Sequence, residues 1–240
     1  MAHPATVAAL TDLAEEQWGL FTRRQADATG MAWTTLSRLA RDGAAERIAH
    51  GVYRLRGAPP PDDLFLLAAW LQLAPNTPVW ERSPSLGVVS HRSAAALYDL
   101  GHLIADVHQF TVPVRRQSRR PDVRLHRAEL RPEEWTRVRG LLVTRPARTA
   151  ADLLGDHEDP QAVGYVVADA LRRDQETPGR VAAAIRPYAG RFGLVPHDGE
   201  ALLHWLLDLT GDPERDRWLA EAHAAVDGDG TTGEPDRIQP

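Results

Sequence analysis

Hydrophobic residues near the start of the chain recur at the spacing of an amphipathic helix. Leu36, Leu39 and Ala40 follow the i, i+3, i+4 pattern that places apolar side chains on one helix face. We therefore expect a helix over residues 32–42, which Gly43 ends. The residues that fall mostly on its other faces are Trp33, Thr34, Ser37, Arg38 and Arg41.

A second helix and a hairpin are expected on either side of this helix. Thr22 is a favourable N-cap for a helix over residues 23–29, and Gly30 supplies the turn that follows. Residues 46–55 are a hairpin candidate because two β-prone arms flank His50-Gly51. Two short helices, a tight turn and a hairpin predict a winged helix-turn-helix, whose second helix enters the major groove of DNA while the hairpin lies along the backbone.

The rest of the chain alternates between helical and extended patterns and then becomes helical. A stiff proline-rich linker at residues 57–61 follows the hairpin. Asp159-Pro160, Thr177-Pro178 and Asp212-Pro213 each combine an N-cap residue with proline, which is typical of a helix start. The expected helices span residues 6–16, 62–74, 90–100, 146–154, 160–174, 178–189, 199–210 and 213–226, and the expected strands 107–112, 123–126 and 141–144.

These elements predict an α+β chain that begins with a winged helix-turn-helix. We expect a DNA-binding domain at residues 1–57, a mixed α/β domain at 62–176 and a helical extension at 177–226. Residues 227–240 are rich in Gly, Asp, Thr and Pro, and we expect this tail to be disordered.

Composition excludes several kinds of site. The chain has no cysteine, so disulfides, thiolate nucleophiles and Cys-ligated zinc are absent. It also has no lysine, which excludes a P-loop, a pyridoxal Schiff base and a lysine-dependent nuclease core. No apolar segment approaches the length of a membrane span, and no signal peptide is recognisable. We expect a cytoplasmic protein without membrane contact.

Charge is divided unevenly along the chain. The formal net charge is −5. Residues 1–150 hold 20 arginines and 15 acidic residues, a balance of +5, whereas residues 151–240 hold 8 arginines and 18 acidic residues, a balance of −10. The front part is therefore suited to meet phosphate, which would repel the back part.

The polar face of the 32–42 helix is the first candidate DNA contact. Its Thr, Ser and Arg side chains can reach base edges and phosphates, and an arginine can bind guanine in two places. Trp33 touches a sugar or a base, or else packs against the preceding helix. Arg47 and Arg54 stand among apolar residues of the hairpin. The alternatives are an ordinary solvated helix face and a helix-turn-helix that binds protein.

A second basic cluster lies between two expected strands. It comprises Arg115, Arg116, Arg119 and Arg120, with Arg124 and Arg127 just beyond. One interpretation is a solvated loop, and the other is a second contact surface for phosphate or for an acidic partner.

An enzymatic function is not expected. Scattered histidines include His91, His126, His157, His197 and His204, but none has the His-Glu-x-x-His spacing of a metalloprotease. There is also no glycine-rich phosphate loop and no Gly-x-Ser-x-Gly elbow. We interpret Ser90 as a helix N-cap and His91 as a structural hydrogen-bonding residue, and we expect neither a metal nor an organic cofactor.

Three segments together resemble the AbiEi antitoxin family of type IV, abortive-infection toxin–antitoxin pairs. The first, from residue 19, is GLFTRRQADATGMAWTTLSRLARDGAAERIAHGVYRL; it resembles the winged helix-turn-helix of that family. The second, from residue 88, is VVSHRSAAALYDLG, similar to the Ser-His-x-x-Ala-Ala helix of the family. The third, from residue 140, is GLLVTRPARTAADLL, similar to its strand-then-helix segment.

The resemblance implies a transcriptional autorepressor that binds inverted repeats in its own promoter, with two copies on one operator. It also implies a partner, a nucleotidyltransferase-like toxin that the protein counteracts with the help of its C-terminal domain, often through basic surface residues. The acidic last third departs from that pattern. The positions that match the recognition helix are Trp33, Thr34, Thr35, Ser37, Arg38 and Arg41, those that match the wing are Arg47, His50 and Arg54, and Arg23 and Arg24 complete the candidate DNA contacts.

One alternative remains open beside the antitoxin. The same DNA-binding head would also suit a stand-alone winged-helix regulator with a ligand-sensing or dimerisation domain behind it. A toxin-like reading frame next to the gene would favour the antitoxin.

Overall fold

The protein divides into two compact units. The computed structural model describes residues 4–229, and of the helix that ends at Asp229 it describes side chains only as far as residue 224. The first unit holds the chain as far as Val89 together with residues 107–130 and 137–143, and the second holds residues 90–106, 131–136 and the chain from 144 onward. The expected domain boundary at residues 57–62 lies inside the first unit, so the expected domains stay a prediction.

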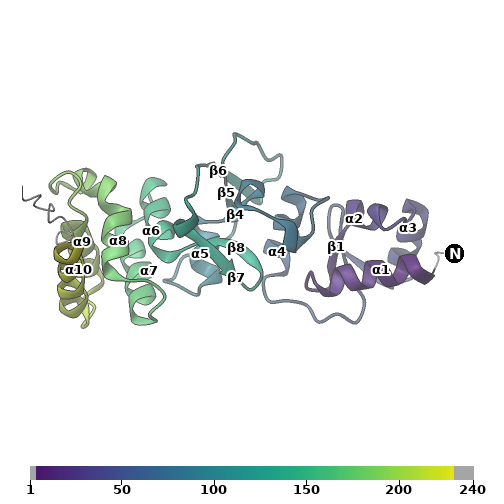
Figure 1. The fold of residues 1–240 in the computed structure, drawn as a ribbon, viewed down its shortest axis with the longest axis horizontal. Helices are drawn as coiled ribbons and strands as arrows, with labels where there is room; N and C mark the ends of the chain where they lie inside the picture. Colours follow the sequence, from purple (N-terminus) through teal and green to yellow (C-terminus); the bar gives the residue numbers. More distant parts are fainter. Residues whose placement is uncertain (1–3, 230–240) are drawn as a thin grey trace, which may run out of the picture. The chain divides into compact units, whose positions relative to one another are not determined.

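The first unit begins with the winged helix-turn-helix. Its elements are α1 (Pro4–Glu15), β1 (Leu20–Thr22), α2 (Arg23–Ala28), α3 (Trp33–Arg41), β2 (Ala45–Ala49) and β3 (Val52–Leu55) (Figure 1). β3 is the central strand of a small antiparallel sheet with the order β1-β3-β2. The three expected helices and the hairpin are therefore present. The sequence pattern did not indicate β1, which is only three residues long.

Local chemistry explains where α2 begins and what anchors α3. The Thr22 side chain accepts a hydrogen bond from the Gln25 backbone N–H, and the Gln25 side chain returns one from the Thr22 N–H, so the two form a capping box. Phe21 and Tyr53 stack with ring centroids 5.7 Å apart in the core below the helices. Leu36 is buried in the same core and fixes the rotation of α3, leaving the opposite helix face in solvent.

Behind the winged helix, the first unit continues with α4 (Leu64–Leu73) and a mixed sheet. Two 3-10 turns, Val79–Glu81 and Pro84–Leu86, lead to β4 (Val88–Val89). The sheet has the order β6-β5-β4-β8-β7, in which β4 pairs antiparallel with β5 and parallel with β8, while β5 and β6 are parallel. The other strands are β5 (His108–Val112), β6 (Val123–Arg127), β7 (Trp135–Val138) and β8 (Leu141–Thr144). Of these, β4 and β7 were not expected from the sequence.

α4 is joined to the winged helix by packing and by buried hydrogen bonds. It contacts all three strands of the small sheet. The amides of Gln17 and Gln25 exchange hydrogen bonds of 3.1 and 2.9 Å, and the Val79 N–H donates to Gln17 Oε1 over 3.1 Å. The Thr22 hydroxyl also donates to the Pro75 carbonyl. Because these groups are buried, breaking any bond would leave a polar atom without a partner, so α2 is held firmly on residues 75–79.

The second unit is helical. It contains α5 (His91–Leu97), a 3-10 turn (Pro132–Glu134), α6 (Pro146–Gly155), α7 (Pro160–Arg172), α8 (Pro178–Ile185), a 3-10 segment (Arg186–Phe192), α9 (Gly199–Thr210) and α10 (Arg215–Asp229) (Figure 1). Helices α5 to α10 share one hydrophobic core, in which Trp218 and Ile185 are buried.

Three expectations about these helices need correction. The expected helix over residues 178–189 ends at Ile185, because Pro187 has no N–H for the helical hydrogen bond and its ring clashes with the preceding turn. Asp159 caps α7 as expected, whereas the Thr177 side chain makes no capping bond to α8. α10 continues to Asp229, so residues 227–229 belong to a helix, and the rest of the expected tail lies outside the described residues.

Asp152 gives the second unit a predicted pH dependence. Burial raises the pKa of this carboxyl to about 6, although Arg148 donates to it over 2.7 Å. In the unfolded chain the carboxyl titrates near its ordinary value, so between about pH 4 and pH 6 the folded state binds the additional proton. The free energy of unfolding is therefore expected to fall by on the order of 2–3 kcal/mol as pH rises through that window.

Denaturant unfolding of the wild type and of Asp152→Asn at pH 4 to 7 checks this expectation. As pH rises through the window, the free energy of unfolding of the wild type should fall relative to that of Asp152→Asn. A difference that is independent of pH would show that Asp152 titrates normally.

Candidate nucleic-acid interface

The polar face of α3 lies in solvent. Thr34, Ser37 and Arg41 are exposed, while Thr35 and Arg38 are partly exposed. Arg41 makes only a weak ion pair with its neighbour Asp42, at 3.7 Å. An α-helix with its side chains is about 10–12 Å in diameter, which fits the major groove of B-DNA, about 12 Å wide.

Trp33 is half exposed and carries an arginine on its ring. Its exposed fraction is 48%, and the Arg23 guanidinium lies 4.5 Å from the ring centroid. Arg23 is the first residue of α2, so this cation–π contact joins the beginnings of α2 and α3. Arg24 is exposed beside it. The tryptophan thus keeps part of its ring free and positions a guanidinium at the edge of the α3 face.

The wing is a short hairpin with a tight turn. Gly51, at φ +70°, supplies the left-handed backbone that the turn requires. Arg47 is exposed; its Nε donates to the Ala49 carbonyl, and its Nη2 lies 3.2 Å from His50 Nδ1. Arg47 and His50 therefore lie together at the tip of the wing.

Arg54 lies apart from these groups. It forms a 2.7 Å ion pair with Glu46, and only 18% of its side chain is exposed. Its guanidinium serves the pairing of β2 with β3, so we leave Arg54 out of the proposed contact surface.

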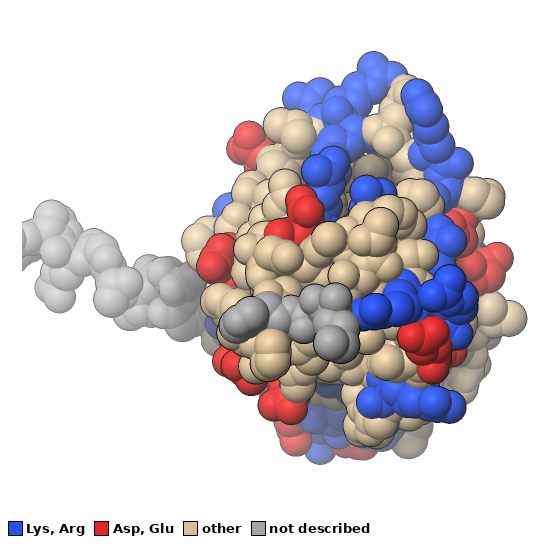
Figure 2. Space-filling model, turned by 90° about the vertical axis from the view of Figure 1, so that its right-hand side faces the viewer, with Lys and Arg blue, Asp and Glu red and all other residues tan. Residues whose placement is uncertain are grey.

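Figure 2 faces the side on which α1, α2 and α3 are drawn in Figure 1. Arginine side chains gather over the upper and right-hand parts of this view, and acidic side chains lie along the left and also between arginines on the right. The exposed arginines of residues 4–57 are Arg23, Arg24, Arg41, Arg47 and Arg56. Exposed arginines favour the approach of a phosphate backbone.

The second basic cluster lies on residues 113–122, here called the basic loop, which connects the parallel strands β5 and β6. Arg115, Arg116 and Arg119 are exposed, and Arg116 donates to the Leu73 carbonyl over 2.9 Å. Arg120 instead hydrogen-bonds to Asp122 and holds the pKa of that carboxyl below its usual value. Three of the four arginines therefore carry no ion pair within the described part of the chain.

One residue near the wing was missed by sequence reasoning. Gln72 donates from its side-chain amide to the His50 carbonyl over 2.7 Å, so α4 supports the tip of the wing. Gln72 is the only polar residue in the ten-residue sequence of α4. A single amide in an otherwise apolar helix could have indicated this role, because a buried polar group needs a specific hydrogen-bond partner.

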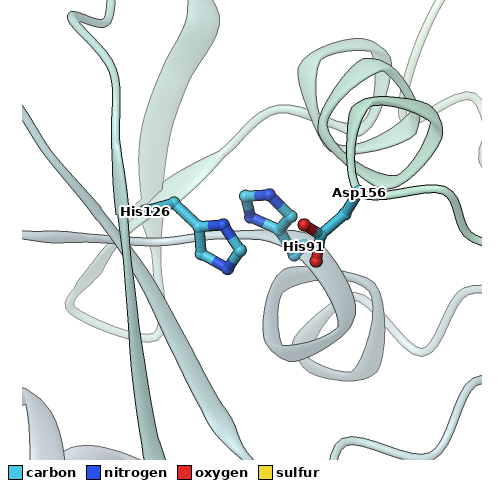
Figure 3. A group of neighbouring side chains, drawn as sticks. All are labelled: His91, His126 and Asp156. Carbon is cyan, nitrogen blue, oxygen red and sulfur yellow. The ribbon is translucent and has the colours of Figure 1, made fainter.

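Among the described residues, the histidines do not form a metal site within one unit. His91, at the start of α5, and Asp156, just after α6, face each other in the second unit with ligand atoms within 4.8 Å (Figure 3). His126, also drawn there, belongs to β6 in the first unit. Two ligands from one unit fall short of the three or four that protein metal sites use. Ser90 stands at the N-cap of α5, but its hydroxyl lies 2.9 Å from His91 Nδ1 and makes no capping bond, so the expected capping role of its side chain was wrong.

Comparison with known proteins confirms the family of the N-terminal segment. Residues 8–56 match the family described as "Transcriptional regulator, AbiEi antitoxin". No curated protein matches the chain. The fold is similar to the crystal structure of a Mycobacterium tuberculosis protein, with a TM-score of 0.50 and 16% sequence identity over 92% of this chain and 83% of that one. At this identity the likeness concerns the fold, which is α+β with an N-terminal winged helix-turn-helix.

The structure also bears on membrane association. Among residues 4–229, no helix combines the length and the apolar composition that a membrane crossing needs.

Proposed function

We propose that this protein is a transcriptional repressor that binds inverted repeats in its own promoter. α3 enters the major groove, where Thr34, Ser37 and Arg38 reach base edges, and the wing follows the adjacent backbone. Two copies on one inverted repeat block the promoter sterically. The domain predicted at residues 1–57 supplies this contact.

One observation carries the proposal, the exposed polar face of α3 beside a cluster of available arginines. Arg23, Arg24, Arg38 and Arg47 make no ion pair with a carboxylate in the part of the chain that the structure describes. Arginines that remain unpaired on a protein with a net charge of −5 fit an anionic partner that approaches this face. The family of residues 8–56 supports the same interpretation.

A fluorescence-anisotropy titration tests the proposal. The full-length protein is titrated against its own upstream DNA and against a shuffled duplex of equal length, over a series of salt concentrations. We expect binding to the native sequence at least about a thousandfold tighter than to the shuffled one, with an affinity that falls steeply as salt increases. Equal and weak binding to both duplexes would exclude sequence-specific DNA recognition.

We further propose that the protein counteracts a nucleotidyltransferase-like toxin encoded beside it. The support is the antitoxin family of residues 8–56. Co-expression with the neighbouring reading frame should restore growth that the toxin alone prevents. If no adjacent frame is toxic, the protein is instead the stand-alone regulator described above.

A further inference from the structure

A continuous series of contacts leads from α3 to the wing. The Arg23 guanidinium rests on the Trp33 ring at the beginning of α3. The backbone N–H of the same Arg23 donates to the Gly51 carbonyl, in the turn of the wing, over 2.8 Å. The helix that would enter the groove and the tip of the wing are thus held at a fixed separation by one residue.

The series continues from the wing to the basic loop through two consecutive residues of α4. Gln72 donates to the carbonyl of His50 at the wing tip. The carbonyl of Leu73, the next residue, accepts the hydrogen bond from Arg116. Since neighbouring Cα atoms are about 3.8 Å apart, the basic loop and the wing tip both contact the last turn of α4.

Strand topology explains why the basic loop reaches α4. Because β5 and β6 are parallel, the chain that joins them must return along the whole length of the strands before it enters β6. Here the return is made by ten residues, 113–122, without a helix. Arg115 and Arg119 lie exposed on this return, and neither has a carboxylate partner among the residues that the structure describes.

We propose that the basic loop is a second contact with the DNA backbone, which continues from the wing onto flanking DNA. The inference rests on the proposed function, because it places the loop on the duplex that α3 and the wing bind. Arg115, Arg116 and Arg119 bind phosphate oxygens beyond the wing side of each half-site. Such contacts are independent of sequence, so they add affinity and fix orientation without adding base specificity.

Counterion release sets the size of the expected effect. Each phosphate that a protein neutralises on B-DNA contributes about 0.9 to the slope of log affinity against log salt concentration. If Arg115 and Arg119 each bind one phosphate, the double variant Arg115→Ala/Arg119→Ala has a slope that is shallower by about 1.8. Between 50 and 200 mM salt, the wild type would then lose about twelvefold more affinity than the variant.

The decisive experiment varies the protein and the DNA together. One half-site is placed in three duplexes: a minimal one, one extended by about one helical turn on one side, and one extended equally on the other. Wild type and Arg115→Ala/Arg119→Ala are titrated against each over the salt series. We expect the salt slopes of the two proteins to differ on only one of the extended duplexes and to be equal on the minimal duplex. Their preference for native over shuffled DNA should be the same.

A control variant separates a local contact from a loss of net charge. Arg180→Ala/Arg186→Ala removes two exposed arginines from the second unit and changes the net charge by the same amount. We expect this control to keep the wild-type slope on all three duplexes. Thermal melting of both variants shows that each one is folded.

The outcomes separate this inference from the proposed function. If the wild type itself does not prefer native DNA, the proposed function fails. If it does, but the loop variant keeps the wild-type slope on both extended duplexes, the inference is wrong, and an acidic protein becomes the candidate partner of the loop. An equal change in the control variant would also overturn it, because net charge alone would then explain the effect.

Discussion

The double variant Arg38→Ala/Arg41→Ala is expected to bind promoter DNA with much lower specificity than the wild type. Both side chains lie on the solvent side of α3, opposite the buried Leu36, so their removal leaves the core unchanged. A bidentate arginine–guanine contact contributes about 1–3 kcal/mol of discrimination, so two such contacts correspond to a loss of about 30-fold or more. Fluorescence anisotropy against native and shuffled duplexes measures the loss.

The single variants then assign a role to each arginine. A variant that binds both duplexes more weakly by the same factor has lost a phosphate contact and should show a shallower salt slope. A variant that loses preference for the native duplex has lost a base contact. Arg186→Ala, an exposed arginine of the second unit, is the matched control. Wild-type affinity and preference in the double variant would mean that α3 does not enter the groove, which would favour a protein-binding role for the winged helix.

The second large effect is expected from Arg82, which is a structural residue. This guanidinium is buried, and it donates to the carbonyls of Leu71, Ala74 and Thr77 over 2.8, 2.7 and 3.2 Å, as well as to that of Trp70. These acceptors include the last carbonyls of α4, which have no partner within the helix. Burial lowers the pKa of Arg82 to about 10. The backbone carbonyls therefore replace most of the water that would otherwise hydrate the guanidinium.

Replacing Arg82 with methionine is therefore expected to reduce the free energy of unfolding by about 3–5 kcal/mol, because several buried carbonyls lose their donors together. Urea unfolding followed by circular dichroism measures the change. Arg56→Met, at an exposed arginine, should cost less than about 0.5 kcal/mol and serves as the control. An Arg82→Met protein as stable as this control would show that water replaces the guanidinium at the end of α4.

Arg82→Lys provides a milder comparison. Lysine keeps the positive charge but lacks the planar group that bonds several carbonyls at once. We therefore expect Arg82→Lys to lose more free energy of unfolding than the control Arg56→Met and less than Arg82→Met. The same variants should also weaken DNA binding, since Gln72 on α4 holds the tip of the wing.

Local chemistry made the winged helix predictable from the sequence. Thr22 and Gln25 form a capping box within four residues, and Gly51 allows the turn of the hairpin without help from distant residues. The spacing of Leu36 and Leu39 indicated which face of α3 is buried, and the structure agrees. Every group needed for these interpretations lies within a few residues of its partner, so the pattern along the chain contains the information.

Groups whose partners are far apart in the chain were decided only by the tertiary structure. The strands β1 and β4 have three and two residues, too few for a periodic pattern, and they form because β3 and β5, much later in the chain, supply their hydrogen bonds. The pairing of Arg54 with Glu46 likewise depends on the register of β2 against β3.

The candidate site divides in the same way. The sequence by itself determined which arginines exist, that they are concentrated in residues 1–150, and that those of α3 face away from the core. Only the tertiary structure brought the basic loop close to the wing. Gln72 donates to His50 at the wing tip, and Leu73 accepts from Arg116 in the loop, although His50 and Arg116 are 66 residues apart in the chain. The physical reason is that a parallel strand pair forces its connection back along the sheet, and no local pattern in the sequence specifies which strands will be parallel.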